Sequence, residues 1–347
     1  MITAVNLLGS VADVAGVAGR ALATLYLACA LVLSIILTIQ TAYTLYLMVY
    51  IWDRPDAYGR ARAPERFLKP KKSFTVLLPC RNEENVIQST IERVVRAHYP
   101  LSLLEVVVIC TPDDTGTITK AQEKIAHLRE RGVKCVRVIA YRGAPTNKPH
   151  GLNAGLRASR NEVVTIFDAE DDVHPDIFNV VNTLMVSEHV NVIQCGVQLM
   201  NYESNWYSAL NVLEYFFWFK SRLHYHASIG SIPLGGNTVF FTRHVLERVG
   251  GWDEHNLTED ADIGIRVSCL GEPIRVVYDA RYVTREETPP TLGHFIKQRT
   301  RWSQGFLQTL LKGEWRHFPT LRQQLLAVYT LVFPMVQAAL GIYLLVA

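Results

Sequence analysis

Two long stretches of the chain lack charged side chains altogether. Residues 21–52 and residues 325–347 contain no Asp, Glu, Lys or Arg, and each is longer than the roughly 20 apolar residues that cross a bilayer as a helix. Aromatic side chains gather at the end of the first stretch, as they do at a membrane interface; they are Tyr43, Tyr46, Tyr50 and Trp52. The pattern predicts two transmembrane helices. A buried core helix is the alternative for the second, which contains Pro334 and Gln337.

The basic residues predict how these helices are oriented. Seven basic residues and three acidic ones lie within residues 53–72, whereas Arg20 is the only basic residue before the first stretch. Because basic segments stay on the cytoplasmic side of a plasma or inner membrane, residues 1–20 are expected outside the cytoplasm and residues 53–324 inside it. Three prolines among the charges mark residues 53–72 as a juxtamembrane linker that can contact anionic lipid headgroups. Residues 313–324 are expected to lie at the interface.

The middle of the chain alternates between short apolar runs and helix-like segments. The runs predict strands at 74–78, 104–110, 133–140 and 163–167. The segments between them predict helices at 84–97, with Asn82 as a candidate cap, at 119–131, stopped by Gly132, and at 153–158. Strands that are apolar throughout and separated by helices indicate an α/β domain over residues 73–312. Its sheet should be mixed and mostly parallel, with helices on both faces.

Residues 190–245 follow a different pattern. Two further strands are expected at 192–198 and 238–242. The segment between them, residues 206–226, is amphipathic and rich in aromatic side chains. It fits ordinary core as well as it fits a membrane-surface element or the wall of a sugar-binding path.

The predicted strand at 163–167 runs directly into Asp168, Glu170, Asp171 and Asp172. Clustered carboxylates repel one another and resist losing water, so they are tolerated where a cation neutralises them. The carboxyl end of a strand is also where parallel sheets bind ligands. These residues therefore predict a divalent-metal site, with a solvated acidic loop as the alternative.

Three other polar motifs carry candidate chemistry. Asp113, Asp114 and Lys148 have the chemistry that a nucleotide site needs, although each alone is more often a turn or cap residue. Thr258-Glu259-Asp260 is explained either as a helix start, in which acids complement the macrodipole, or as the position of a general base. Gln298-Arg299-Thr300-Arg301-Trp302 is either an exposed basic helix or a binding element.

Composition narrows the class of protein. The hydrophobic fraction of 49% is high for a soluble enzyme, and the charged fraction is 19%. A net charge of +3 gives no sign of nucleic-acid binding. The six cysteines are scattered without metal-ligand or redox spacing, as expected in a reducing compartment.

Taken in order, these motifs resemble the inverting family 2 glycosyltransferases, in particular the membrane-embedded branch with cellulose and hyaluronan synthases. The resemblance covers residues 73–312 and rests on Asp113-Asp114, Asp168-Ala169-Glu170, Thr258-Glu259-Asp260 and the Gln-x-x-Arg-Trp signature, Gln298 to Trp302. It implies a GT-A (Rossmann-like) fold flanked by transmembrane helices, a UDP-sugar donor, and Mg²⁺ or Mn²⁺.

The resemblance also implies roles for single residues. Asp113 or Asp114 would contact the uracil, and Lys148 and Arg301 would bind the donor phosphates. Asp168 would lie on the nucleotide side, with Glu170 as its partner in holding the metal. Asp260 would be the catalytic base, and Glu259, Gln298 and Trp302 would contact the acceptor. Glu170 replaces the commoner Asp, and Thr111-Pro112 departs from the commonest pattern.

The sequence therefore predicts a membrane glycosyltransferase that moves a hexose, with UDP-glucose as the first expectation, to a growing β-linked polysaccharide. Two spans are too few to enclose a pore for a sugar chain, so export would need oligomerisation or a partner subunit. The alternatives are transfer of one sugar to a membrane lipid, a non-catalytic scaffold, or a membrane-anchored nucleotide-binding module.

Overall fold

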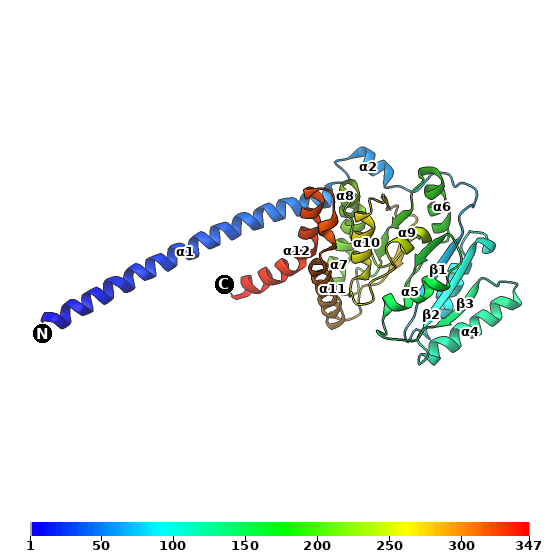
Figure 1. Cartoon of the computed structure of the whole chain (residues 1–347), viewed down its shortest axis with the longest axis horizontal. Helices are drawn as coiled ribbons and strands as arrows, with labels where there is room; N and C mark the ends of the chain where they lie inside the picture. The colour runs from blue at the N-terminus through cyan, green and yellow to red at the C-terminus, as the bar shows by residue number, and fades with distance from the viewer. Residues whose placement is uncertain (1, 347) are drawn as a thin grey trace. The chain divides into compact units, whose positions relative to one another are not determined.

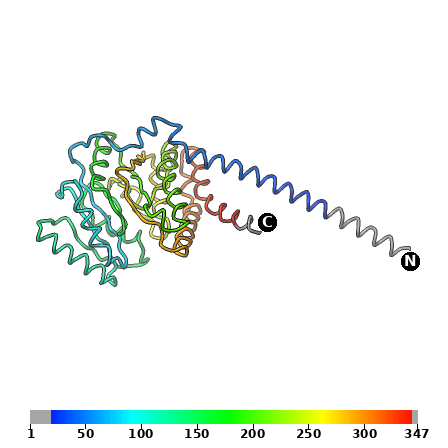
Figure 2. The backbone as a smooth tube through the Cα atoms, turned by 180° about the vertical axis from the view of Figure 1, so that it is seen from behind, coloured from blue at the N-terminus to red at the C-terminus, as the bar shows by residue number. Residues whose placement is uncertain are grey.

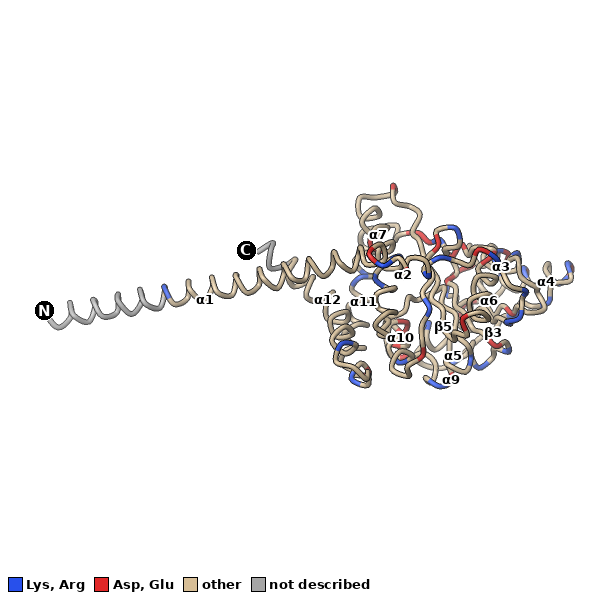
Figure 3. Tube along the Cα trace, turned by 90° about the horizontal axis from the view of Figure 1, so that it is seen from above, with Lys and Arg blue, Asp and Glu red and all other residues tan. Residues whose placement is uncertain are grey.

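The computed structural model describes the backbone of residues 2–346 and the side chains of residues 19–341. The chain divides into two units, residues 1–50 and residues 51–347. The first unit is one helix, α1 (Ile2–Val49), and no charged residue follows Arg20 along it (Figure 3). Residues 2–20, expected to form a separate segment, belong to this helix because no proline interrupts them. The helix ends before Trp52, since residues 50–53 form a turn.

The second unit is built on a sheet (Figure 1), which has seven strands in the described part of the chain. Their order is β3 (Val136–Ala140), β2 (Leu104–Cys110), β1 (Phe74–Pro79), β4 (Val163–Ile166), β7 (Val239–Thr242), β5 (Val192–Cys195) and β8 (Ile274–Val277). The first four are parallel, β7 is antiparallel to both of its neighbours, and β5 and β8 are parallel. Two short parallel strands, β6 (Val197–Leu199) and β9 (Thr284–Glu286), pair separately. The predicted mixed, mostly parallel sheet is confirmed.

Helices cover both faces of the sheet, as Figures 1 and 2 show. Alternate residues of a strand point to opposite faces, so Val76 and Leu78 pack in one apolar cluster and Leu77 in the other. The first cluster is covered by α3 (Ile87–Val95), α4 (Thr115–Glu130) and α6 (Ile177–Glu188). The second is covered by α5 (Lys148–Ala158), α9 (Arg243–Arg248) and α10 (Glu259–Cys269).

Several predicted boundaries differ from the structure. Asn82 does not cap the helix after β1: it has a positive φ of 60°, and α3 begins only at Ile87. Helix α5 begins at Lys148 rather than 153, because Asn147 accepts a hydrogen bond from the His150 amide and proline is tolerated in the first turn. Helix α6 and strands β8 and β9 were not predicted. Buried Asn182 and Thr183 interrupt the apolar pattern of α6.

The aromatic segment 206–226 is helical and partly buried in the domain. It forms α7 (Trp206–Phe217), a π-helical turn (Trp218–Arg222) and α8 (Leu223–Ile229). Tyr207 and Phe219 are buried in the domain, whereas Trp206, Leu210 and Leu213 are exposed. One face of α7 is therefore ordinary core, and the exposed face is free to contact a membrane or another partner.

Residues 53–72 are not a free linker. They contain the short helix α2 (Pro55–Arg60), and buried Asn182 of α6 accepts hydrogen bonds from the amides of Lys71 and Lys72. The Ala63 amide donates to Asp279. The segment is anchored to the domain because its backbone donors find buried side-chain partners there.

The last part of the second unit is helical. Helix α11 (Leu292–Lys312) is followed by a 3₁₀ turn (Glu314–His317) and by α12 (Leu321–Val346). Residues 321–324, expected in an interfacial segment, belong to α12. By length and composition, two described segments qualify as membrane spans, Gly19–Val49 and Leu321–Gly341. Core helices and signal sequences also meet that criterion, so the expected membrane topology stays a prediction.

Candidate active site

Acidic residues that follow three strands meet at one edge of the sheet; Asp114 and Asp168 were predicted there, and Glu83 was not. Strands β1, β2 and β4 are parallel neighbours, so their carboxyl ends lie side by side. Glu83, Asp114 and Asp168 follow these three ends. They lie near enough to interact: burial, together with the carboxylates of Glu170, Asp114 and Asp168, raises the pKa of Glu83 to about 7.

The two acids after β2 have different surroundings. Asp114 is buried and caps α4 by accepting from the Thr117 amide at 3.2 Å, while its other oxygen accepts from the Asn82 amide at 2.8 Å. Asp113 is exposed, and the nearby Thr111 hydroxyl together with the backbone amide of Asp113 holds its pKa below the usual range. Asp114 therefore joins two loops at the site, whereas the side chain of Asp113 is open to solvent.

Lys148 lies near two of the predicted site residues, Asp168 and Asp260. Its Nζ lies 2.5 Å from Oδ1 of Asp168 and 3.5 Å from the carbonyl oxygen of Gly236. A Cβ atom placed on Gly236 would lie 3.1 Å from Oδ2 of Asp260, so a side chain at this position would crowd that carboxylate. Burial alone would lower the pKa of Lys148, but the carboxylates of Asp168, Glu259 and Asp260 raise it. Lys148 is thus a charged ammonium between Asp168 and Asp260.

The carboxylates around Asp168 have a donor chemistry suited to a hard cation. Partial burial of the carboxyl group and the neighbouring Asp168 carboxylate raise the pKa of Glu170. Oxygen ligands that repel one another in this way fit Mg²⁺ or Mn²⁺, and Mg²⁺ usually needs only one or two protein carboxylates beside substrate phosphates. No group of three or more Asp, Glu, His or Cys residues in the described chain is arranged to hold a metal alone. Asp168 and Glu170 remain the candidate pair.

Sequence reasoning missed three residues that support Asp168. Asp171 is fully buried, and its Oδ2 accepts from the Asp168 amide at 2.8 Å. The side-chain nitrogen of Asn237 donates to both oxygens of Asp171 at 3.1 Å and also contacts Glu286. Burial and the Asp168 carboxylate raise the pKa of Glu286 to about 7. Asp171 stood within the recognised acidic run, whereas nothing in the local sequence of Asn237 or Glu286 singles them out.

The start of α10 presents the predicted base. Thr258 stands at the N-cap position, but its hydroxyl makes no capping bond and instead contacts Asn256 at 3.3 Å. The predicted helix start is confirmed, with Glu259, Asp260 and Asp262 in the first turn of α10, although Thr258 provides no side-chain cap. Burial raises the pKa of Asp260, while Lys148 and Arg301 oppose the shift. Burial and the Asp260 carboxylate also raise the pKa of Glu259, to about 7.

Helix α11 carries the predicted acceptor and phosphate residues. Arg301 is exposed, and its positive charge counteracts the effect of burial on the pKa of Asp260. The ring of Trp302 lies 6.3 Å from that of Tyr215 on α7. Oε1 of Gln298 is buried and has no hydrogen-bond partner among the described residues, so it is available to a ligand. Arg299 is already engaged: it binds Asn211 and Glu214 and packs over the ring of Trp302.

The raised pKa values predict that the ligand-free domain becomes less stable as pH rises. Glu83, Glu259 and Glu286 titrate near 7 in the folded domain and near their ordinary value of about 4.3 when unfolded. Between these values the folded state binds more protons, so the free energy of unfolding falls with increasing pH. We expect the melting temperature of metal-free protein to be at least about 2 °C lower at pH 8 than at pH 5.5.

Thermal unfolding followed by circular dichroism across this range checks the prediction. Glu286→Gln should flatten the dependence, whereas Glu247→Gln, on the exposed face of α9, should leave it unchanged. A melting temperature that rises with pH would contradict the acid cluster.

Comparison with known proteins identifies the family. The family described as "Glycosyltransferase like family 2" matches residues 70–305. A "Probable glycosyltransferase YdaM" of Bacillus subtilis is 28% identical over 75% of this chain and 61% of its own length. A poly-beta-1,6-N-acetyl-D-glucosamine synthase of Staphylococcus epidermidis is 23% identical, covering 85% and 68%. A beta-monoglucosyldiacylglycerol synthase of Nostoc is 26% identical, covering 80% and 57%. The chain thus spans less than two thirds of two of these relatives.

Solved structures agree with the fold. A mannosyltransferase from Pyrobaculum calidifontis, in complex with GDP-Man and Mn²⁺, matches 90% of this chain and 91% of its own, with a TM-score of 0.56 and 19% identity. Residues 1–349 of S. aureus TarS, in complex with UDP-GlcNAc, match 76% and 81%, with a TM-score of 0.51 and 16% identity. The predicted GT-A type of α/β fold is supported.

Proposed function

Because the chain belongs to glycosyltransferase-like family 2, matched over residues 70–305, we propose that it transfers a hexose from a UDP-sugar to an acceptor hydroxyl with inversion. The observation that carries the proposal is the grouping of Asp168, Lys148 and Asp260 around Gly236. The ammonium of Lys148, between the carboxylates of Asp168 and Asp260, can bind the donor diphosphate while Asp260 stays available as the catalytic base. UDP-glucose is the first expectation for the donor.

Asp260 is the base in this mechanism. Its carboxylate takes the proton of the acceptor hydroxyl as that oxygen attacks the anomeric carbon. The new C–O bond forms as the bond between the anomeric carbon and the diphosphate oxygen breaks, and the electron pair leaves with UDP. With one base and no enzyme nucleophile, an α-linked donor gives a β-linked product. The raised pKa of Asp260 makes it a better proton acceptor than an ordinary aspartate.

Asp113 or Asp114, Lys148 and Arg301 are proposed to hold the donor. Of the two acids, exposed Asp113 is favoured for contact with the uracil ring, because both side-chain oxygens of Asp114 already accept hydrogen bonds from backbone amides. The positive charges of the Lys148 ammonium and the Arg301 guanidinium both counteract the effect of burial on the pKa of Asp260. Both can bind phosphate oxygens, and Arg301 can do so with two parallel hydrogen bonds.

Asp168 and Glu170 would hold a divalent cation, Mg²⁺ or Mn²⁺. When bound, such an ion neutralises the charge that develops on the departing diphosphate. The mutual repulsion of the carboxylates supports this assignment, and so does the Mn²⁺ in the complex of the similar mannosyltransferase. Asp171 contributes by fixing the Asp168 backbone from the buried side.

Glu259, Gln298 and Trp302 are proposed to contact the acceptor. Trp302 offers a flat apolar face to a sugar ring, and the unpartnered Oε1 of Gln298 can accept from a hydroxyl. We infer a growing β-linked glycan as the acceptor, in keeping with the Gln-x-x-Arg-Trp signature of the cellulose and hyaluronan synthase branch and with the polysaccharide synthase among the relatives.

A membrane lipid is the second candidate acceptor. Two observations favour it: the exposed apolar residues Trp206, Leu210 and Leu213 on α7, and the glycolipid synthase among the relatives. A lipid hydroxyl held near the bilayer would then take one sugar.

Incubating the full chain in lipid nanodiscs with a panel of donors tests the proposal. UDP-glucose, UDP-N-acetylglucosamine and GDP-mannose are offered with and without diacylglycerol in the bilayer, and products are sized by mass spectrometry. A long chain supports the polysaccharide synthase, and a single sugar on diacylglycerol supports the lipid enzyme. EDTA should abolish either product and Mn²⁺ should restore it. UDP binding without transfer from any donor would indicate a non-catalytic scaffold or nucleotide-binding module instead.

A further inference from the structure

One face of α11 continues past the signature residues. Gln298, Arg301 and Trp302 are followed on the same face by Gly305, Gln308, Thr309 and Lys312, since residues three, four and seven apart share a helix face. None of the latter four has a role in the mechanism above. All four contact the loop 253–258 or α10, the elements that carry the base.

At Gly305, helix α11 comes into close contact with Thr258, the residue that precedes α10. A Cβ atom placed there would lie 2.5 Å from Oγ1 and 2.6 Å from the amide nitrogen of Thr258, which is closer than real side chains pack. Thr258 precedes Asp260 by two residues, and Gly305 follows Trp302 by three. The missing side chain thus sets the distance between the signature helix and the start of α10.

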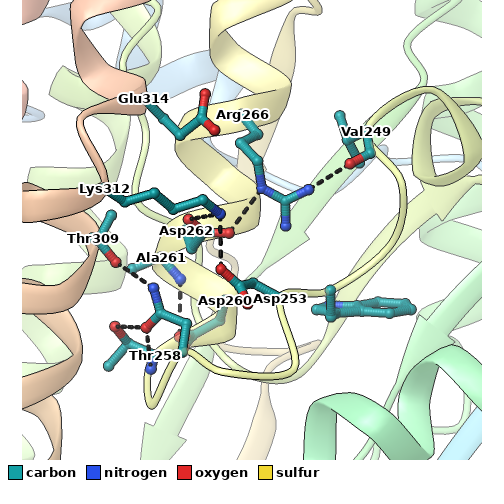
Figure 4. Close-up of polar contacts among 12 residues, drawn as sticks. Val249, Asp253, Thr258, Asp260, Ala261, Asp262, Arg266, Thr309, Lys312 and Glu314 are labelled. Atoms are coloured by element: carbon teal, nitrogen blue, oxygen red, sulfur yellow. Dashed lines mark hydrogen bonds and ion pairs between the residues drawn. The ribbon is translucent and has the colours of Figure 1, made fainter.

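Two hydrogen bonds fix the loop before α10. The side-chain nitrogen of Asn256 donates to Oγ1 of Thr309 at 2.9 Å, and the Leu257 amide donates to Oε1 of Gln308 at 2.9 Å. Figure 4 shows Thr309 beside the loop that leads into Thr258. These bonds attach the two residues that precede Thr258 to α11.

An ion pair fixes the rotation of α10. Asp262 is fully buried and lies about 200° around the helix from Asp260, so it faces away from the site. Its Oδ2 accepts from Nε of Arg266 at 2.7 Å and its Oδ1 accepts from Nζ of Lys312 at 2.9 Å. Lys312 also binds Asp253 at 2.9 Å (Figure 4). Arg266 lies on the same helix as Asp262, whereas Lys312 belongs to α11 and therefore joins the two helices.

We propose that Gly305, Gln308, Thr309 and Lys312 form a positioning seam that sets Asp260 in register with the acceptor residues of α11, with the Lys312–Asp262 pair as its principal contact. The seam acts through α10 and touches no substrate. This inference rests on the proposed function, because it assigns the seam to the geometry of sugar transfer. Rotation of α10 by part of a turn would move the base away from the acceptor held by Trp302.

Lys312→Met tests the seam because it removes the charge and keeps most of the side-chain length. We expect turnover of UDP-glucose, or of UDP-N-acetylglucosamine if that is the donor used, to fall at least about 10-fold, with the donor KM within twofold of wild type. Amide hydrogen exchange at residues 255–262 should accelerate while β2 is unchanged. Lys312→Arg should recover most of the turnover. Lys120→Met, which removes an exposed ion pair with Glu123 on α4, is the matched control.

Faster exchange with unchanged turnover would show that the seam only stabilises the fold, and unchanged exchange would show that no seam exists; either result overturns the proposal. If Lys312→Met fails to fold, Gln308→Ala and Thr309→Val each remove one hydrogen bond and should still lower turnover without changing the donor KM. If wild-type protein transfers no sugar, the proposed function fails, and hydrogen exchange alone then decides whether the seam orders α10.

Discussion

Asp260→Asn is expected to abolish sugar transfer while leaving UDP binding largely intact. The substitution keeps the size of the side chain and removes its ability to take a proton, so the rate should fall by about 10²- to 10⁴-fold, the usual contribution of a general base. Donor binding should survive because Lys148, Asp168 and Arg301 are unchanged. Removing one carboxylate beside Lys148 even reduces the repulsion that a diphosphate meets. Turnover of labelled donor and calorimetric titration with UDP and Mn²⁺ measure the two effects separately.

Two comparisons make this result specific. Asp56→Asn changes an exposed aspartate on α2 and should leave both turnover and UDP affinity at wild-type values. Glu259→Gln changes the neighbouring buried acid, which the mechanism assigns to acceptor contact, and should raise the acceptor KM more than it lowers the donor affinity. Equal loss of transfer and UDP binding in Asp260→Asn would remove Asp260 from the role of base.

The sequence predicts the sheet well because its strands are uniformly apolar. Every strand expected in the parallel half is found, since Val, Ile and Leu runs such as residues 104–110 have no alternative but burial. Helix α6 was not predicted because buried Asn182 interrupts its apolar pattern. The side chain of Asn182 accepts hydrogen bonds from the backbone amides of Lys71 and Lys72, which are distant in the sequence. The same contact explains why residues 53–72 are docked rather than free. A polar residue that serves a distant segment cannot be recognised from periodicity.

The candidate site shows a second limit of prediction from the sequence. Asp168 to Asp172 form one acidic run in the sequence, yet Asp171 is buried under the backbone of Asp168 and Asp172 is exposed. The turn after β4, rather than composition, separates these two roles. Asn237 and Glu286 lie far from this run in the chain, and only the sheet brings them to Asp171. Residue types at spaced motifs therefore indicate candidate reacting groups, whereas the residues that orient these groups are found only from the tertiary fold.

The helix α11 was predicted only as a signature and not as a contact surface. The spacing of Gly305, Gln308, Thr309 and Lys312 after Trp302 is visible in the sequence. What the spacing cannot show is which element lies opposite. Once α10 is known to pack against α11, one face of α11 is seen to carry both the predicted acceptor residues and the residues that contact α10 and the loop before it.

Arg301→Lys is expected to lower kcat/KM for the donor by about 10- to 100-fold, although the charge is conserved. The guanidinium of Arg301 is exposed, and its only hydrogen bond to a described residue is a long one, 3.5 Å to the Leu257 carbonyl oxygen. It is therefore free to bind a diphosphate with two parallel hydrogen bonds, which a lysine ammonium cannot reproduce. A charge-assisted hydrogen bond contributes about 1.5–3 kcal/mol, which corresponds to this loss.

Arg299 cannot substitute for Arg301, because its guanidinium binds Glu214 and Asn211 and lies over Trp302. Since lysine keeps the positive charge near Asp260, the pH dependence of kcat in Arg301→Lys should stay close to that of wild type, which separates loss of the phosphate contact from damage to the base. Arg129→Lys on the exposed face of α4 is the matched control and should have no effect. A steady-state rate in Arg301→Lys within twofold of wild type would show that the diphosphate is held by Lys148 and the metal without the arginine fork.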